Sequence, residues 1–371
     1  MSGGVITQVA ESAGRRDGRG PWIGPGLVDL QINGYLGHDF NHDPLCASTV
    51  VGASEALSSQ GVTSYFPTLI TNSEHAIRRA VRAINRASSC AGAGGIVAGI
   101  HLEGPFISPE DGPRGAHDKA HVRPPDWAMF QRWQEAAGGS IRMVTLSPEW
   151  EGSLRFIERC VQSGVLVSLG HTGASPEQIA DAIDAGARMS THLGNGMHLV
   201  LPRHPNYLWE QLASDGLWAS VIADGRHLPP SVLKVILRVK GDKAILVSDA
   251  VCVSGLEPGE YELHIGGRVV LTPDGRLHLA EQPGLLAGSV ITLPVAISYL
   301  VRNGLSSLAD AWAMASTRPA SAAGLATAGG LEPGLPADVT LFDWDDKEVT
   351  VRAGYKGGRL IYQAPSRVGD A

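Results

Sequence analysis

The chain has 371 residues, of which 43% are hydrophobic and 18% charged, and its formal net charge is −7. This length suits one barrel-sized domain with a small appendage, and the composition is that of an ordinary globular core. The negative charge argues against a nucleic-acid or anionic-membrane partner, and no apolar run is long enough to span a bilayer.

Short apolar segments alternate with amphipathic ones over most of the chain. In the Gly- and Arg-rich region before Pro25, only Val5–Val9 is predicted to be a strand. Beyond it, helices such as Ala47–Gln60 and Glu74–Ala87 separate eight predicted strands. Such alternation favours an α/β fold with a parallel sheet, and eight units favour a (β/α)₈ TIM barrel over a doubly wound sheet. The predicted strands are Leu27–Ile32, Val62–Phe66, Ile96–Leu102, Ile141–Leu146, Val165–Leu169, Arg188–Thr191, Trp218–Ala223 and Ala244–Ser248.

One stretch, from Val165 to Met197, places two histidines at equivalent positions. Its first predicted strand ends just before His171, and Ser175-Pro176-Glu177 then signals a helix start. The next short strand leads directly to His192. Because the carboxyl ends of parallel strands meet at one rim of a closed barrel, both imidazoles are expected at the rim where barrel enzymes build their sites.

The last third of the chain departs from this rhythm. Residues 255–285 are predicted to form an inserted hairpin that turns at Pro273-Asp274-Gly275. Helices are predicted again at Leu293–Arg302 and Leu308–Leu325, followed by short strands from Gly330 onward. The expected organisation is a small β-domain from residues 1–25 and 330–371, and a barrel from residues 26–329.

Four cysteines lie far apart and show no CxxC or disulfide-framework spacing. The first twenty residues lack the apolar segment of a secretory signal. A cytoplasmic location is therefore expected, with these cysteines as buried thiols.

Four polar residues share one context, since Glu103, His171, His192 and Asp249 each follow a predicted barrel strand. Two imidazoles and one carboxylate leave an open position on a tetrahedral Zn²⁺, as in hydrolytic sites. Asp249 is then the candidate general acid/base. Taken singly, each residue has a plainer explanation, such as a structural hydrogen bond or a helix cap. Those explanations are independent of one another, so four such residues together favour one site.

Five motifs resemble, in order, those of the N-acetylglucosamine-6-phosphate deacetylase family of the amidohydrolase superfamily. The resemblance extends from Gly26 to Asp343 and implies that Glu103, His171 and His192 bind the metal. It also implies that Asp249 is the general acid/base and that His117 lies near the scissile carbonyl. The motifs are HLEGPFI (101–107), GHT (170–172), THLGNGM (191–197), ADGRH (223–227) and SDA (248–250).

The same resemblance implies the substrate contacts. Asn195 and Gly196 match the turn that contacts the sugar phosphate, and Arg203 falls where the family has a phosphate-binding arginine. His227 matches a histidine that contacts the sugar ring or phosphate. A guanidinium fork and backbone N–H groups suit a phosphate dianion. The implied partner is a small phosphorylated N-acetyl amino sugar.

The chain also departs from the family pattern. Many amidohydrolases have His-x-His after the first strand for a second metal, whereas this chain has Gln31-Ile32-Asn33. One divalent metal ion is therefore implied, with zinc expected, although such ligands accept several ions. Gly196 stands where these deacetylases commonly have alanine. The family often forms dimers, which leaves a homodimer open.

Two alternatives to this deacetylase hypothesis stay open. One is a related amidohydrolase that acts on another N-acyl amine or cyclic amide. The other is a non-catalytic barrel that keeps a metal site for binding or assembly. The second is disfavoured, because Asp249 accompanies the three ligands and a purely structural zinc site would be closed.

Overall fold

The computed structural model describes residues 1–10, 21–90, 95–263 and 267–365. Its centre is an eight-stranded sheet whose paired strands all run parallel, in the order β2-β5-β6-β7-β8-β9-β10-β11. Beyond the last paired residues of β11, the backbone N–H of Asp249 donates to the Gln31 carbonyl at 2.8 Å, which brings the ends of the sheet together. The predicted barrel is confirmed. Its strands are β2 (Leu27–Ile32), β5 (Val62–Ile70), β6 (Ile100–Glu103), β7 (Ile141–Leu146), β8 (Leu166–Leu169), β9 (Met189–Ser190), β10 (Trp218–Val221) and β11 (Ala244–Leu246).

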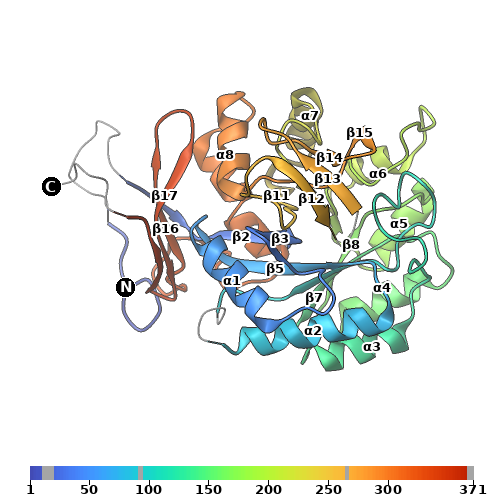
Figure 1. Ribbon diagram of the computed structural model, residues 1–371, viewed down its shortest axis with the longest axis horizontal. Helices are drawn as coiled ribbons and strands as arrows, with labels where there is room; N and C mark the ends of the chain where they lie inside the picture. The colour runs from blue at the N-terminus through green and yellow to red at the C-terminus, as the bar shows by residue number, and fades with distance from the viewer. Residues whose placement is uncertain (11–20, 91–94, 264–266, 366–371) are drawn as a thin grey trace.

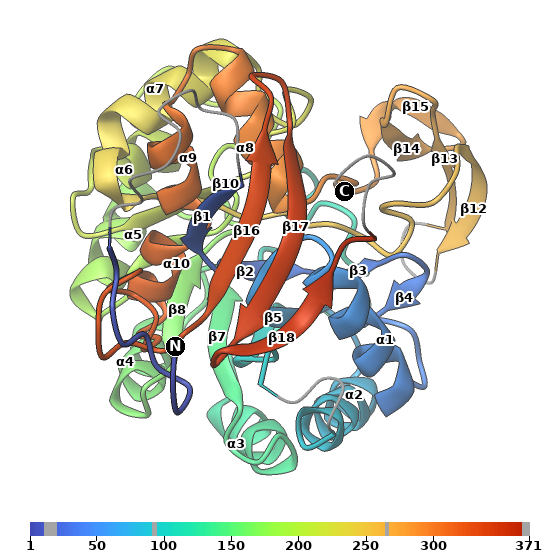
Figure 2. The ribbon, with the colours of Figure 1, turned by 90° about the vertical axis from the view of Figure 1, so that its left-hand side faces the viewer.

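Helices surround this sheet, as Figures 1 and 2 show. The predicted helix Leu308–Leu325 is wrong as one element, because it is broken at Ala315 and Ser316. Pro319 has no N–H to donate to the Ala315 carbonyl four residues earlier. That carbonyl instead accepts from the backbone N–H of Val28 at 2.8 Å, so the break joins the helical layer to β2. The helices are α1 (Ala47–Ser58), α2 (Glu74–Ser88), α3 (Trp127–Ala136), α4 (Ser153–Gln162), α5 (Pro176–Asp184), α6 (Tyr207–Ala213), α7 (Pro230–Lys240), α8 (Leu293–Arg302), α9 (Leu308–Met314) and α10 (Thr317–Ala322).

A second sheet unites the two ends of the chain, as predicted. It is antiparallel, in the order β1-β16-β17-β18, and Figure 2 shows it in front of the barrel. The strands are β1 (Trp22–Pro25), β16 (Val339–Trp344), β17 (Val349–Lys356) and β18 (Arg359–Gln363). The predicted strand Val5–Val9 is wrong, since in it only Val5 makes isolated bridges, to Ser2 and Pro336.

The N-terminal partner of β16 is instead β1, a segment that the sequence analysis missed because it contains glycine and proline. Gly24 is required there: a Cβ atom on it would lie 2.4 Å from Nε1 of Trp312, which donates to the Pro25 carbonyl at 2.9 Å. The exact division into domains at residues 25 and 330 stays a prediction.

The insertion is larger than the predicted hairpin. It forms a four-stranded antiparallel sheet, β12 (Gly259–Leu263), β13 (Gly267–Leu271), β14 (Leu277–Leu279) and β15 (Gln282–Leu286). The predicted turn at Pro273–Gly275 joins β13 to β14. This sheet has a small apolar core of its own and stands apart from the helical layer in Figure 2. No helix among the described residues is both long and apolar enough to cross a membrane.

Candidate metal centre and active site

The strand ends deliver the four predicted chemical residues to one rim. Glu103 is the last residue of β6, whereas His171, His192 and Asp249 follow β8, β9 and β11. The last three adopt left-handed backbone conformations, with φ of 49°, 29° and 47°. Residues other than glycine rarely do so, and such strain persists only where the surroundings hold it. The backbone is thus turned sharply at these positions.

Glu103, His171 and His192 form the one group with metal-ligand spacing among the described residues, and all three are buried. Nε2 of His192 lies 3.1 Å from Oε1 of Glu103 and 3.0 Å from Nε2 of His171. The remaining pair, His171 Nε2 and Glu103 Oε1, is 3.3 Å apart. Ligand atoms of a tetrahedral zinc ion are about 3.3 Å apart, given bond lengths near 2.0–2.1 Å. The donor set therefore fits one such ion.

The hydrogen bonds of the histidines also suit a metal. Nδ1 of His171 lies 2.8 Å from the Pro113 carbonyl, which can only accept, so Nδ1 carries the hydrogen and Nε2 offers a lone pair. Nε2 of His192 meets Nε2 of His171 directly. Two nitrogen lone pairs that face each other at this distance repel unless a proton or a cation lies between them. Nδ1 of His192 is buried without a hydrogen-bond partner in the described part of the chain.

The Gln31-Ile32-Asn33 stretch supports both carboxylates of the site. Nε2 of Gln31 donates to Oε1 of Glu103 at 2.7 Å, and Nδ2 of Asn33 donates to Oδ1 of Asp249 at 2.8 Å. Neutral amides thus occupy the two positions that the His-x-His pattern gives to histidines. Sequence reasoning identified this substitution but not the two bonds that it makes.

Burial and mutual contact set the charges of the site. Burial opposes ionisation of Glu103, but hydrogen bonds with His171 and His192 outweigh it and hold its pKa well below the usual value. Burial also opposes a charged His192, yet the bond to Glu103 raises its pKa above the usual value. Burial and then the Glu103 charge raise the pKa of Asp249 to about 6. A cation held by the three ligands would act on Asp249 in the opposite direction.

His117 lies beside the metal ligands. Its ring packs edge-on against that of His171, with centroids 4.4 Å apart, and it is buried. Nδ1 lies 2.8 Å from Oγ1 of Thr71. Burial lowers the pKa of His117 to about 3, so its imidazole is neutral.

The loop after His192 packs on the metal centre. Nδ2 and the backbone N–H of Asn195 both point to the His192 carbonyl, at 3.4 and 2.9 Å. Gly196 has φ of +59°, and a Cβ atom there would lie 2.8 Å from Nδ1 of His171. The glycine that departs from the family pattern therefore allows close contact between this loop and a ligand. Both residues line a small hollow together with His171 and Thr172.

His227 is oriented by a residue that sequence reasoning missed. Its Nδ1 lies 2.7 Å from Oδ2 of Asp224, which also accepts the His227 backbone N–H through Oδ1 at 2.8 Å. The motif ADGRH contained the signal, because an aspartate three residues before a histidine can bond to it locally.

Arg203 is not joined to the other candidates by any hydrogen bond or ion pair in the described residues. It lies in an exposed stretch, where only its backbone carbonyl is engaged, by Nε1 of Trp209 at 3.1 Å. The neighbouring Leu199 and Val200 are 95% and 85% exposed. The role of Arg203 stays a prediction.

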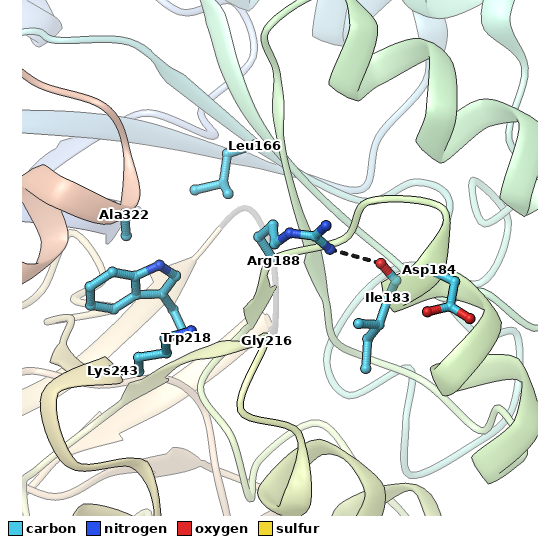
Figure 3. A pocket seen from close by; sticks show the side chains of 8 residues that line it. All are labelled: Leu166, Ile183, Asp184, Arg188, Gly216, Trp218, Lys243 and Ala322. Carbon is cyan, nitrogen blue, oxygen red and sulfur yellow. Dashed lines mark hydrogen bonds between the residues drawn. The ribbon is translucent and has the colours of Figure 1, made fainter.

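A larger cavity lies at the opposite rim and does not contain these residues. Its volume is about 520 Å³, and Leu166 and Trp218 on its wall begin β8 and β10, at the ends of the strands away from the metal ligands. Figure 3 shows Arg188 on this wall, donating to the Ile183 carbonyl at 2.7 Å. Cavity volume alone therefore does not identify the candidate active site.

Comparison with known proteins places the chain among hydrolases. The model of the family described as "Amidohydrolase family" matches residues 22–361. N-acetylglucosamine-6-phosphate deacetylase of Homo sapiens is 35% identical over 364 residues, 94% of this chain and 86% of that protein. N-acetylgalactosamine-6-phosphate deacetylase of Shewanella sp. (strain ANA-3) is 34% identical over 343 residues, 91% of this chain and 83% of that protein.

A solved structure extends the similarity to three dimensions. It is a mutant N-acetyl-D-glucosamine-6-phosphate deacetylase from Mycobacterium smegmatis in complex with N-acetyl-D-glucosamine-6-phosphate. The TM-score is 0.84 at 29% sequence identity, and the match covers 97% of this chain and 93% of that one.

Proposed function

The chain belongs to the amidohydrolase family, and we propose that it removes the acetyl group from N-acetylglucosamine 6-phosphate, giving glucosamine 6-phosphate and acetate. The observation that carries this proposal is the buried Glu103–His171–His192 group with Asp249 on the same rim. It occurs in a chain that resembles deacetylases of this substrate over most of its length.

One divalent ion, zinc by preference, is proposed at Glu103, His171 and His192. When bound, such an ion lowers the pKa of water and polarises a carbonyl group. The tautomer of His171 and the bond from Gln31 to Glu103 orient two of the ligands. Gln31 and Asn33 hold neutral amides against the two carboxylates of the site, at the positions where a second ion would need histidines, which supports one ion per chain.

Asp249 is proposed to move the protons. Asn33 occupies its Oδ1 and so fixes the carboxyl group. The other oxygen is left to take a proton from the attacking water and to pass it to the departing amine. Asp249 must therefore be ionised in the resting enzyme to accept the first proton, and it donates that same proton to the amine in the second transfer.

His117 is proposed to contact the oxygen of the acetamide carbonyl. If Thr71 donates its hydroxyl hydrogen to Nδ1, the neutral ring carries its own hydrogen on Nε2. That N–H can donate to the oxygen as negative charge develops on it. The low pKa of His117 supports this role, because the ring need not lose a proton first.

Asn195, Gly196, Arg203 and His227 are proposed to bind the sugar phosphate. Support comes from the loop at Gly196, which lies against the metal centre, and from Asp224, which orients His227. The similar Shewanella protein, named for N-acetylgalactosamine 6-phosphate, favours a second candidate substrate. The two sugars differ in the configuration of one hydroxyl group.

Acetate release from both phosphorylated sugars and from their unphosphorylated forms tests this proposal. The highest kcat/KM is expected for N-acetylglucosamine 6-phosphate. A preference for the galactosamine compound would select the second substrate. Release from neither phosphorylated sugar by the zinc-loaded protein would favour another N-acyl amine or cyclic amide, or a non-catalytic barrel.

We further propose a homodimer in the cytoplasm. The exposed pair Leu199 and Val200 supports the dimer, since a second copy of the chain could remove these apolar side chains from water. All four cysteines are free, which supports a reducing compartment, but the prediction that they are buried is wrong for Cys46 and Cys90, which are exposed. Sedimentation should show a dimer that Leu199→Ser with Val200→Ser converts to a monomer.

A further inference from the structure

The strained backbone of His171 is fixed from both sides. With φ of +49°, it needs neighbours that hold it in place. On one side, the backbone N–H of Ser108 donates to the His171 carbonyl at 2.8 Å. On the other, the backbone N–H of Gly173 donates to Oε2 of Glu149 at 2.7 Å. The second anchor is a side chain with no role in the proposed chemistry.

The Glu149 carboxylate accepts hydrogen bonds from residues in three loops. Besides Gly173, which follows β8, Oε2 accepts from the hydroxyl of Ser147, after β7, at 2.7 Å. Oε1 accepts from the hydroxyl of Ser108, after β6, at 2.8 Å. Hydrogen bonds to a carboxylate are stronger than those between neutral groups. Both sides of the His171 backbone are therefore tied to one half-buried side chain.

The other strained ligand is held differently. The backbone N–H of His192 donates to the neutral hydroxyl of Ser220 at 2.7 Å. The segment after His171 is also enclosed, because a Cβ atom on Gly173 would lie 3.2 Å from Cε1 of His198 and 3.4 Å from Oε2 of both Glu110 and Glu149. A small displacement of the Glu149 carboxylate would thus shift the backbone that orients the His171 side chain.

We propose that Glu149 is a positioning residue that sets His171 for metal binding. It acts through the backbone on both sides of His171 and touches neither metal nor substrate. This inference rests on the metal site of the proposed function.

Competition of the metal-free full-length protein with a chelator for Zn²⁺ tests it. Glu149→Ala removes all three hydrogen bonds and should weaken Zn²⁺ binding by roughly 10–100-fold. This is the usual effect of removing a residue that orients a metal ligand without itself binding the metal. Glu110→Ala is the matched control. Its carboxylate lies in the same cluster but pairs with His198 at 2.8 Å, so its zinc affinity should equal that of wild type.

Glu149→Gln keeps the shape of the side chain and retains one acceptor oxygen, so a smaller loss is expected. If Glu149→Ala does not fold, the zinc affinity of Glu149→Gln tests the positioning role in its place. Thermal unfolding of the metal-free variants separates positioning from stability. Activity lost in the folded Glu149→Gln variant should return with excess Zn²⁺, because only its zinc affinity is lowered.

Zinc affinity equal to wild type in the folded Glu149 variants would overturn the positioning role. An equal loss in Glu110→Ala would also overturn it, because the whole cluster would then be responsible. A wild-type protein that binds no Zn²⁺ would instead refute the metal site of the proposed function, which is a separate outcome.

Discussion

The metal centre and the loop at residues 194–206 are in contact at Gly196 and His171, yet they are held in different ways. Glu103, His171 and His192 are buried at strand ends and joined by hydrogen bonds to one another. The loop begins with equally tight packing at Gly196 but continues into Leu199 and Arg203, which are exposed. The difference suggests that the barrel fixes the chemistry, while the loop sets which substrate reaches it.

Removing a strand-end ligand should have the largest effect. His192→Ala is expected to lose most of the bound zinc and with it the activity, as measured by elemental analysis and acetate release. His198→Ala, outside the ligand group, should keep the metal. Because the pKa of His192 is raised, protons compete with the ion, and zinc affinity should fall as the pH is lowered. Two tightly held ions per wild-type chain would contradict the one-metal site.

Asp249→Asn should lower kcat by about 10²–10⁴-fold, the usual contribution of general acid–base catalysis. Asparagine tolerates the positive φ of this position and can still accept from Asn33. Zinc affinity and KM should therefore change little. Near-normal kcat with a lower melting temperature would show that Asp249 is only structural.

Asp29, below the rim on β2, should make the metal-free protein sensitive to pH. Burial, the largest cause, raises its pKa from 3.8 to about 7. The stability that this group contributes is then present below the unfolded pKa and is lost as the pH rises through about 7. A loss of up to roughly 4 kcal/mol follows from this shift.

Urea unfolding at about pH 5 and about pH 8 measures this effect. Asp29→Asn should lose less stability between the two conditions than wild type. A smaller fall should remain in the variant, because the pKa of Asp249 is raised in the same direction. Equal falls in both proteins would exclude Asp29 as the source.

The loop should show a weaker effect that depends on the substrate. If Arg203 binds the phosphate, Arg203→Ala should cost about 1.5–3 kcal/mol, seen as a higher KM for the phosphorylated sugar. The unphosphorylated sugar should be nearly unaffected. Arg188→Ala, which alters the cavity at the opposite rim, is the control. Equal effects on both substrates would remove Arg203 from phosphate recognition.

Sequence reasoning succeeded where a local pattern determines the structure. Apolar runs between helices gave all eight barrel strands, and the strand-end rule brought Glu103, His171 and His192 together. It failed at Val5–Val9 and at Leu308–Leu325, where pairing partners and one proline decided the outcome. The contact of Gln31 with Glu103 and that of Glu149 with Ser108 join segments distant in sequence, so no local pattern could indicate them.

The smallest effect is expected at the start of α5, which connects the two histidine-bearing strands. The predicted helix start is confirmed, and Ser175 forms a capping box there: its Oγ accepts from the Gln178 N–H at 3.3 Å, and Oε1 of Gln178 accepts from the Ser175 N–H at 2.9 Å. Ser175→Ala should therefore lower the free energy of unfolding by about 1 kcal/mol.

Zinc affinity and kcat should stay unchanged in Ser175→Ala, because the backbone of His171 is held by Ser108 and by the Glu149–Gly173 bond rather than by the start of the helix. Urea unfolding and zinc competition on the same preparation check both statements. A variant that lost zinc affinity in proportion to its stability would show that the positions of His171 and His192 depend on the helix between their strands. The barrel rim would then not be held independently of the elements around it.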